Sequence, residues 1–191
     1  TLLISASPFY IEPLLRKASY DAVTDFSAVT MVDRAPNLLV VHPSVAANSV
    51  KDLIALAKAK PGALNYGSGS TGSSTHLAGE LFKSMAGVNV VRIPYKSGGT
   101  AVTDLVGGHV QLMFATPASA TPQVKAGKLR ALAVTSAEPS TLLPGVPTVA
   151  ASGLPGYESG AMAGLFAPVK TAKTIIDRLN QEIVRVLNRP E

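Results

Sequence analysis

Short runs of valine, isoleucine and leucine are spaced along the chain between polar, glycine- and proline-rich stretches. Apolar runs of this length, bounded by turn residues, are typical of strands buried in a sheet. A short strand at 64–66 is also predicted, because it leads directly into a glycine-rich loop. The other strands are predicted at residues 2–4, 28–32, 38–41, 90–93, 110–114 and 129–134.

Between these runs, apolar residues recur three and four positions apart, which is the spacing of an amphipathic helix. Ser49 is a predicted N-cap of a helix that ends before Pro61. Ser73 or Ser74 is the predicted N-cap of a second helix, for which Gly87 is the stop signal. Further helices are predicted at 100–106, 118–126 and 171–187, and an amphipathic segment at 10–15.

The order of these elements indicates the fold class. Strand, loop and helix alternate between residues 65 and 135, which predicts an α/β fold with a mostly parallel sheet. Proline- and glycine-rich connectors at 139–147 and 152–156 predict a segment boundary in that region.

Composition restricts the classes of function. Of 191 residues, 47% are hydrophobic and 15% charged, which indicates a folded globular protein. The net charge of +5 comes from scattered basic residues, so it favours a small anion over nucleic acid. The absence of cysteine excludes disulfides and thiolate nucleophiles, and with three histidines we expect no metal site. The uncharged stretch 105–124 contains glycine, proline and glutamine, so we interpret it as helix end, strand and loop and not as a membrane helix.

The loop at 67–75 contains only glycine, serine and threonine, and it separates a predicted strand from a predicted helix. Small residues let backbone N–H groups approach a ligand, and a helix N-terminus adds partial positive charge, so the loop suits a carboxylate or phosphate. Gly67, Gly69 and Gly72 match the G-x-G-x-x-G dinucleotide fingerprint. No acidic residue ends the next strand, although Arg92 leaves an NADP interpretation open. A P-loop would require lysine where Ser73 stands.

A serine nucleophile is a second enzymatic interpretation, because the loop places several hydroxyls near His76. No G-x-S-x-G motif is present, and residues two apart at a helix start do not face each other. The ordinary interpretation of His76 is a surface or capping residue.

Two more loops follow strands and open helices. In 93–100, Tyr95 could close over a ligand at which the N–H groups from Gly98 onward point; in 114–119, Thr116 ends the strand. Each alone is an ordinary βα turn, but together with the glycine-rich loop they line one edge of a parallel sheet, where open α/β folds bind ligands. Ser5 and Ser7 repeat this small, hydroxyl-rich composition after the first strand, as either a ligand loop or a simple turn.

Four long motifs occur in a fixed order: YGSGSTGSSTHLAGELF at 66–82, PYK at 94–96, AGKLRALAVT at 126–135 and LPGVPT at 143–148. Together they resemble the solute receptors of tripartite tricarboxylate transporters, the Bug (Bordetella uptake gene) family. The resemblance extends over essentially the whole chain.

The resemblance implies a periplasmic receptor with the type II periplasmic-binding-protein (Venus flytrap) fold. Such a receptor binds a small organic anion, commonly a carboxylate, in a cleft between two α/β lobes and delivers it to a membrane permease. It would use no cofactor, catalyse no reaction and not itself span the membrane. Residues 1–42 and 156–191 would form the first lobe, and 43–155 the second.

The resemblance also implies which residues contact the ligand. The second lobe would use its loops at 70–74 and 94–99, and the first lobe its loop after the first strand. The predicted ligand-binding residues are Ser5, Ser7, Ser70, Thr71, Gly72, Ser73, Ser74, Tyr95, Gly98 and Thr116.

The chain departs from the family pattern in three places. Typical members have a strand, a glycine-rich ligand loop and a helix before the position of Thr1, and a further helix after Glu191, so we expect an incomplete first lobe with exposed apolar surface. The opening residues show no targeting motif, so we expect any signal peptide to lie outside this sequence. Ala115-Thr116 stands where many relatives carry Asp-Asn, so ligands with an amino group should gain less here.

Two other functions stay open from the sequence. One is an NADP-binding or serine-hydrolase enzyme that uses Gly67 to His76; the other is a sensory receptor of the same fold with a signalling partner.

Overall fold

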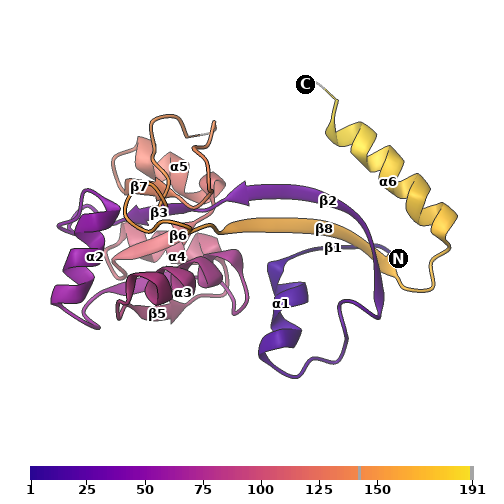
Figure 1. Cartoon of the computed structure of the whole chain (residues 1–191), viewed down its shortest axis with the longest axis horizontal. Helices are drawn as coiled ribbons and strands as arrows, with labels where there is room; N and C mark the ends of the chain where they lie inside the picture. The colour runs from indigo at the N-terminus through magenta and orange to yellow at the C-terminus, as the bar shows by residue number, and fades with distance from the viewer. Residues whose placement is uncertain (142, 190–191) are drawn as a thin grey trace. The chain divides into compact units, whose positions relative to one another are not determined.

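The computed structural model describes residues 1–141 and 143–189, with the element order shown in Figure 1. The chain divides into two compact units: Thr1–Arg34 with Ala161–Glu191, the smaller unit, and Ala35–Gly160, the larger unit. The residues at 38–41, which the sequence analysis assigned to the first lobe, lie in the larger unit. Parts of the predicted connector 139–147 and of the predicted first lobe, at 142 and 190–191, lie outside the described residues.

A five-stranded sheet of order β5-β4-β6-β3-β7 forms the centre of the larger unit. β4 pairs in parallel with β5 and β6, whereas β3 is antiparallel to β6 and β7. Only β3 is therefore reversed, and the predicted α/β fold with a mostly parallel sheet is confirmed. The strands are β3 (Leu38–Val41), β4 (Asn65–Ser68), β5 (Val91–Pro94), β6 (Leu112–Ala115) and β7 (Arg130–Val134).

Four helices connect these strands, and their starts follow the local sequence. The hydroxyl of Ser49 accepts a hydrogen bond from Asp52 N, and that of Ser73 accepts one from His76 N, so both predicted N-caps are confirmed. Gly87 ends its helix in the left-handed conformation, at φ 61°. The helices are α2 (Val50–Ala59), α3 (Ser74–Ala86), α4 (Gly98–Val106) and α5 (Pro117–Lys125).

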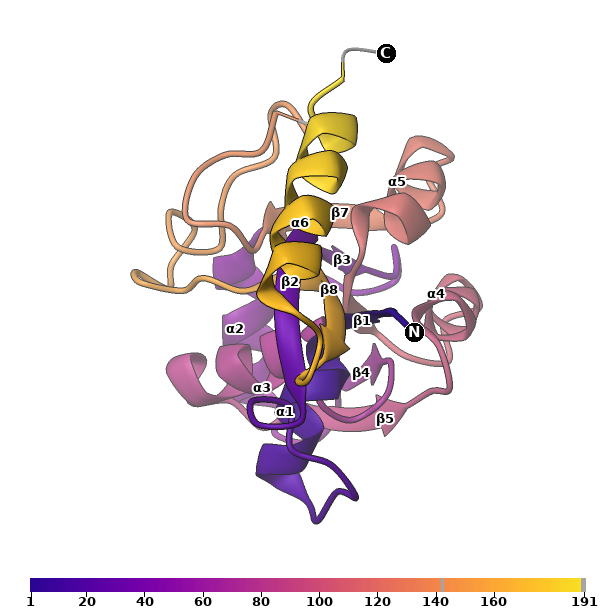
Figure 2. The same ribbon diagram turned by 90° about the vertical axis from the view of Figure 1, so that its right-hand side faces the viewer.

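Helices cover both faces of the sheet in the larger unit. The helices α2 and α3 lie on one face, and α4 and α5 lie on the other (Figure 2). The four residues of β3 are fully buried because alternate side chains enter opposite cores. Leu39 and Val41 pack into one core, which also contains Phe82 of α3. Leu38 and Val40 pack into the other, with Leu105 and other residues of α4.

α3 lies unusually close to the sheet. A Cβ atom on Gly79 would lie 2.4 Å from Tyr66 Cε2, so only glycine allows this approach. The buried Tyr66 ring is held at its far end by Glu80, whose carboxylate accepts a 2.6 Å hydrogen bond from the Tyr66 hydroxyl. The contact fixes the position of α3, and with it the position of the loop that precedes the helix.

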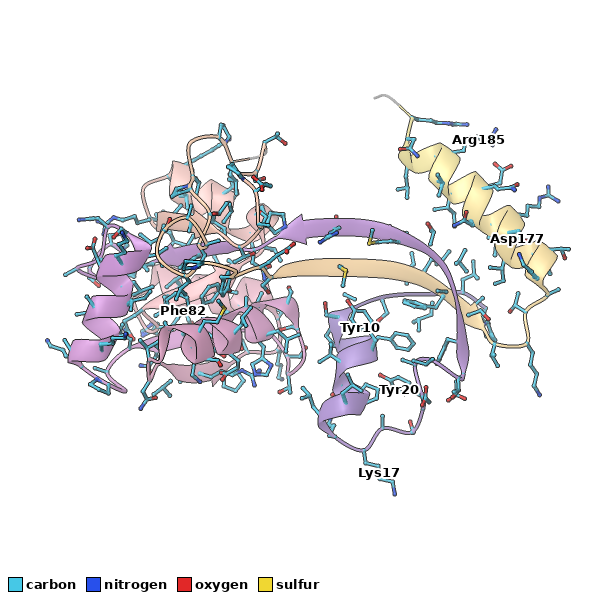
Figure 3. All side chains as sticks on the ribbon, in the orientation of Figure 1. Tyr10, Lys17, Tyr20, Phe82, Asp177 and Arg185 are labelled. Carbon is cyan, nitrogen blue, oxygen red and sulfur yellow. The ribbon has the colours of Figure 1, made fainter. Side chains whose placement is uncertain are left out.

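The smaller unit has a three-stranded sheet of order β1-β8-β2. Val29 and Leu165 of this sheet pack against Ile176, Leu179 and Ile183 of the C-terminal helix. The aromatic rings of Phe9, Tyr20, Phe26 and Phe166 pack together in the same unit. The hydroxyl of Tyr20, which is labelled in Figure 3, donates to Phe9 O at 2.9 Å. The elements are β1 (Leu3–Ala6), α1 (Ser7–Leu15), β2 (Phe26–Pro36), β8 (Gly160–Pro168) and α6 (Lys173–Leu187).

Strand β8 is absent from the sequence-based prediction. Its first half, Gly160-Ala161-Met162-Ala163-Gly164, contains weak strand formers and no β-branched residue. Pairing with β1 and β2 supplies the backbone hydrogen bonds that hold this segment extended.

The uncharged stretch 105–124 contains the end of α4 and the strand β6, as predicted, but its last part forms most of α5 and not a loop. No helix in the described ranges combines the length and apolar content needed to cross a bilayer.

Candidate functional site

The candidate site lies at one edge of the sheet in the larger unit. β5, β4 and β6 are neighbours and run in parallel, so their carboxyl ends share this edge. Each is followed by a loop and a helix: α4 after β5, α3 after β4 and α5 after β6. The structure therefore brings together the three loops that the sequence analysis singled out.

The glycine-rich loop is held in shape by its own side chains. Gly69 N donates to Thr75 Oγ1 at 2.9 Å, and the hydroxyls of Ser73 and Thr75 are 3.0 Å apart. Gly72 has φ 80°, which glycine adopts without strain, and its N–H donates to His76 Nδ1 at 3.1 Å. Ser70, at the tip of the loop, is exposed.

Arg92, from the neighbouring strand β5, fastens this loop with three hydrogen bonds. Its guanidinium donates to Ser68 Oγ at 2.8 Å, to Gly69 O at 3.0 Å and to Thr71 Oγ1 at 3.2 Å. Arg92 was the residue that left an NADP interpretation open, and in the structure three of its five N–H donors are used by the protein itself. Its positive charge also lies next to the loop, which favours an anionic ligand.

His76 supports the loop in its neutral form, since Nδ1 accepts a hydrogen bond and therefore carries no proton. Burial lowers the pKa of His76, and the charge of Arg92 lowers it further. The pKa of His76 in the folded chain is therefore below its unfolded value of about 6.5. Neutral His76 makes its whole contribution to the free energy of unfolding above about pH 6.5, and this contribution is lost as the pH falls toward the folded-state pKa.

We therefore expect His76→Asn, whose side-chain oxygen can accept from Gly72 N, to reduce the loss of stability between pH 7 and pH 5. Urea unfolding of both proteins at each pH measures this difference. Equal losses in the two proteins would show that His76 does not contribute to the acid sensitivity.

The second loop joins β5 to α4. The Ser97 hydroxyl caps α4 by accepting a hydrogen bond from Thr100 N. The Tyr95 hydroxyl donates to Asp104 Oδ2 at 2.8 Å, and burial, with this hydrogen bond, raises the pKa of Tyr95 to about 12. Tyr95 is thus held against α4, so a role in ligand contact would fall to its ring edge or require release from Asp104.

The third loop is the turn from β6 into α5. Thr116 is the N-cap residue, and its hydroxyl lies 2.9 Å from that of Ser119. Both side chains are partly exposed, so Thr116 presents a hydroxyl at the shared edge as predicted.

The first two loops adjoin. A Cβ atom on Gly69 would lie 3.8 Å from Gly98 N, so the backbones of these loops are close. In the described part of the chain, the N–H groups of Ser74, Gly98 and Gly99 donate to no acceptor. The first turns of α3, α4 and α5 also contain no acidic residue. These helix ends therefore offer free donors and partial positive charge, which suit a carboxylate.

Sequence reasoning missed Asn37. Because β3 is reversed, it begins at the edge where its neighbours end, and this places Asn37 beside the site. The residue is fully buried, and its Oδ1 accepts a hydrogen bond from Ser74 Oγ at 3.4 Å. The available signal was a polar residue directly before the apolar run of the predicted strand 38–41, but the reversal of β3 is needed to interpret it.

Ser5 and Ser7 belong to the smaller unit. Ser5 lies in β1, opposite Gly164 of β8, and is partly exposed. Ser7 is the first residue of α1 and is buried, and its hydroxyl accepts a 3.1 Å hydrogen bond from the Tyr10 hydroxyl. The structure therefore has no loop where one was predicted, because β1 ends at Ala6 and α1 begins at Ser7. Ligand contact by Ser5 and Ser7 stays a prediction.

Two proteins from sequence comparison are similar to this chain. It is 34% identical over 193 residues to a UPF0065 protein from the tcbD-tcbE intergenic region of Pseudomonas sp. strain P51, covering 100% of this chain and 57% of that protein. It is 36% identical over 190 residues to protein BugT of Bordetella pertussis, covering 98% and 58% respectively. The chain thus spans somewhat more than half the length of these relatives.

Solved structures give the same result. R. palustris Rpa4515 with adipate has a TM-score of 0.90 and 36% identity, over 98% of this chain and 64% of that one. The periplasmic binding protein BugD has a TM-score of 0.89 and 31% identity, over 99% and 64%. MatC from Rhodopseudomonas palustris with bound malate has a TM-score of 0.86 and 26% identity, over 98% and 65%. The α/β fold is therefore that of periplasmic binding proteins.

The family described as "Tripartite tricarboxylate transporter family receptor" matches residues 1–191. This match covers the whole sequence and agrees with both sets of relatives, so the resemblance seen in the four motifs is confirmed. The chain belongs to the receptor family of tripartite tricarboxylate transporters.

Proposed function

We propose that this chain is the ligand-binding part of a periplasmic solute receptor that binds a small organic carboxylate and delivers it to a membrane permease of the tripartite tricarboxylate transporter type. The observation that carries the proposal is that three helix N-termini share one sheet edge, with no acid in their first turns and with free N–H donors at the starts of α3 and α4. Family membership supports the partner, and the adipate and malate bound by related proteins support the ligand class.

The physical argument concerns desolvation. A carboxylate that leaves water must regain strong hydrogen bonds, and backbone N–H groups at helix ends supply them without a competing ion pair. Ser70 and Thr71 are exposed hydroxyl donors beside those N–H groups. Ser73 contributes chiefly through its cap of α3, which keeps the helix end in place.

The enzymatic alternatives have less support. Three hydrogen bonds hold the Arg92 guanidinium against the glycine-rich loop, so it is not free to extend toward the phosphate of an NADP molecule. His76 Nδ1 accepts a hydrogen bond from a backbone N–H, so this nitrogen does not face a serine as a general base would. Binding without catalysis is the function that this geometry favours.

A thermal-shift screen tests the proposal. The panel contains adipate, malate, succinate and aspartate, with NADPH as the control. A ligand at one hundred times its dissociation constant stabilises the folded chain by about 2.7 kcal/mol, which raises the melting temperature measurably. Because β6 ends at Ala115 and is followed by Thr116, with no acid at either position, malate should stabilise the chain more than aspartate.

Stabilisation by NADPH and by none of the acids would overturn the receptor proposal in favour of a nucleotide site. Delivery to a permease requires a separate measurement, namely uptake of the stabilising acid by cells that contain or lack the receptor gene.

A further inference from the structure

The buried carboxamide of Asn37 has an unused donor beside the end of α3. Its backbone is fixed, because Asn37 N donates to Thr135 Oγ1 at 2.7 Å and Asn37 O accepts from Thr135 N at 2.9 Å. Its Oδ1 accepts from Ser74 Oγ at 3.4 Å. Within the described residues, Nδ2 is the buried side-chain polar atom that has no hydrogen-bond partner.

Reorienting the side chain does not remove this deficit. If the carboxamide were turned over, Nδ2 could donate to Ser74 Oγ, but Oδ1 would then lose its donor. Leaving a buried polar group unpaired destabilises the folded protein, so an unpaired donor at this position calls for an explanation. Leucine has a similar size and would fill the position without that cost.

The neighbour of the carboxamide indicates what the unused donor serves. Ser74 is the first residue of α3, and its own N–H donates to no acceptor among the described residues. The hydroxyl of Ser74 donates to the carboxamide oxygen through a long hydrogen bond, which is weak enough to be exchanged for a stronger one to an anion. An unused amide donor and an unused helix-end donor therefore lie together.

We propose that Asn37 is a further ligand-binding residue, whose Nδ2 donates a hydrogen bond to the carboxylate held at the N-terminus of α3, directly or through one water molecule. Nδ2 is buried in the present structure, so a ligand reaches it only after a neighbouring side chain moves, and Ser74, which contacts the same carboxamide, is the candidate for this movement. The inference rests on the proposed function and adds a specific donor to the same site.

Titration calorimetry with adipate, or with the most stabilising acid of the panel, tests the proposal on the full chain. Asn37→Leu should raise the dissociation constant at least about tenfold, equivalent to about 1.4 kcal/mol, while the protein stays folded. Asn48→Leu is the matched control, since Asn48 is exposed and lies before α2, away from this edge. The Asn48→Leu protein should bind the acid with the same dissociation constant as the wild type.

The outcomes separate the two proposals. A folded Asn37→Leu protein with wild-type affinity would overturn the role of Asn37 and leave the receptor function standing. A wild-type chain that binds no acid of the panel would overturn both. If Asn37→Leu does not fold, the side-chain amide signals of Asn37 in the NMR spectrum of the wild type decide: they should shift on saturation with the acid, and unchanged signals would contradict the proposal.

Discussion

Replacing Phe82 by alanine is expected to lower the free energy of unfolding by about 3–5 kcal/mol, the range for a large aromatic side chain removed from a core. Phe82 is 1% exposed and lies within the larger unit, in the third turn of α3 (Figure 3). Its ring centroid is 5.5 Å from that of Phe114 on β6. Alanine would leave a cavity between helix and sheet that the closely packed surroundings cannot fill.

Urea unfolding followed by circular dichroism measures this loss. Met85→Ala is the matched control, because Met85 lies on the same helix but is 38% exposed, and its loss should be well below that of Phe82→Ala. Similar losses in the two variants would mean that the contact of Phe82 with β6 does not hold α3 in place. A ligand at saturation should recover part of the stability, since it binds the folded chain.

Replacing Arg92 by alanine is expected to weaken binding of the stabilising acid by about tenfold or more. The three hydrogen bonds of Arg92 hold both the backbone and the hydroxyls of the glycine-rich loop. Hydrogen bonds from a charged group contribute about 1.5–3 kcal/mol each, and the contributions of neighbouring bonds do not add fully. Without them, the loop would have to be ordered when the ligand binds, which costs conformational entropy.

Two further variants separate this ordering from the effect of positive charge. Arg92→Lys keeps the charge but cannot form three fixed hydrogen bonds, so it should bind almost as weakly as Arg92→Ala. Lys96→Ala removes a charge from the adjacent, exposed loop and should change the affinity little at physiological salt. If Lys96→Ala and Arg92→Ala weaken binding equally, the net charge of the edge, and not the shape of the loop, determines affinity.

In the proposed site, the charged side chains already have partners within the protein. Arg92 donates three hydrogen bonds to the loop and Asp104 accepts one from Tyr95, so we expect ligand contact chiefly from backbone N–H and hydroxyl groups. Such donors recognise any carboxylate of suitable size, and the shape of the surrounding surface then selects among acids. This agrees with the different acids, adipate and malate, found in related structures.

Local sequence signals placed most elements of the larger unit because each helix carries its own start and stop. The caps at Ser49 and Ser73 and the stop at Gly87 depend on residues within one turn of the helix, so they can be identified without a structure. The helix α4 begins two residues earlier than predicted, because the cap at Ser97 was not recognised. Strand β8 was missed because its residues are extended through pairing with distant strands.

Hydrophobic spacing, glycine positions and motif order are local properties of the chain, so the fold class, the family and the three loops of the candidate site could be predicted from the amino-acid sequence. The use of individual side chains could be established only from the folded structure. Arg92 fastens the loop, Tyr95 is held by Asp104, and Asn37 reaches the edge because β3 runs against its neighbours. These roles depend on contacts between residues that lie 9 to 98 positions apart in the sequence. Most of these residues are brought together by the order and direction of the strands, and no single segment encodes that arrangement.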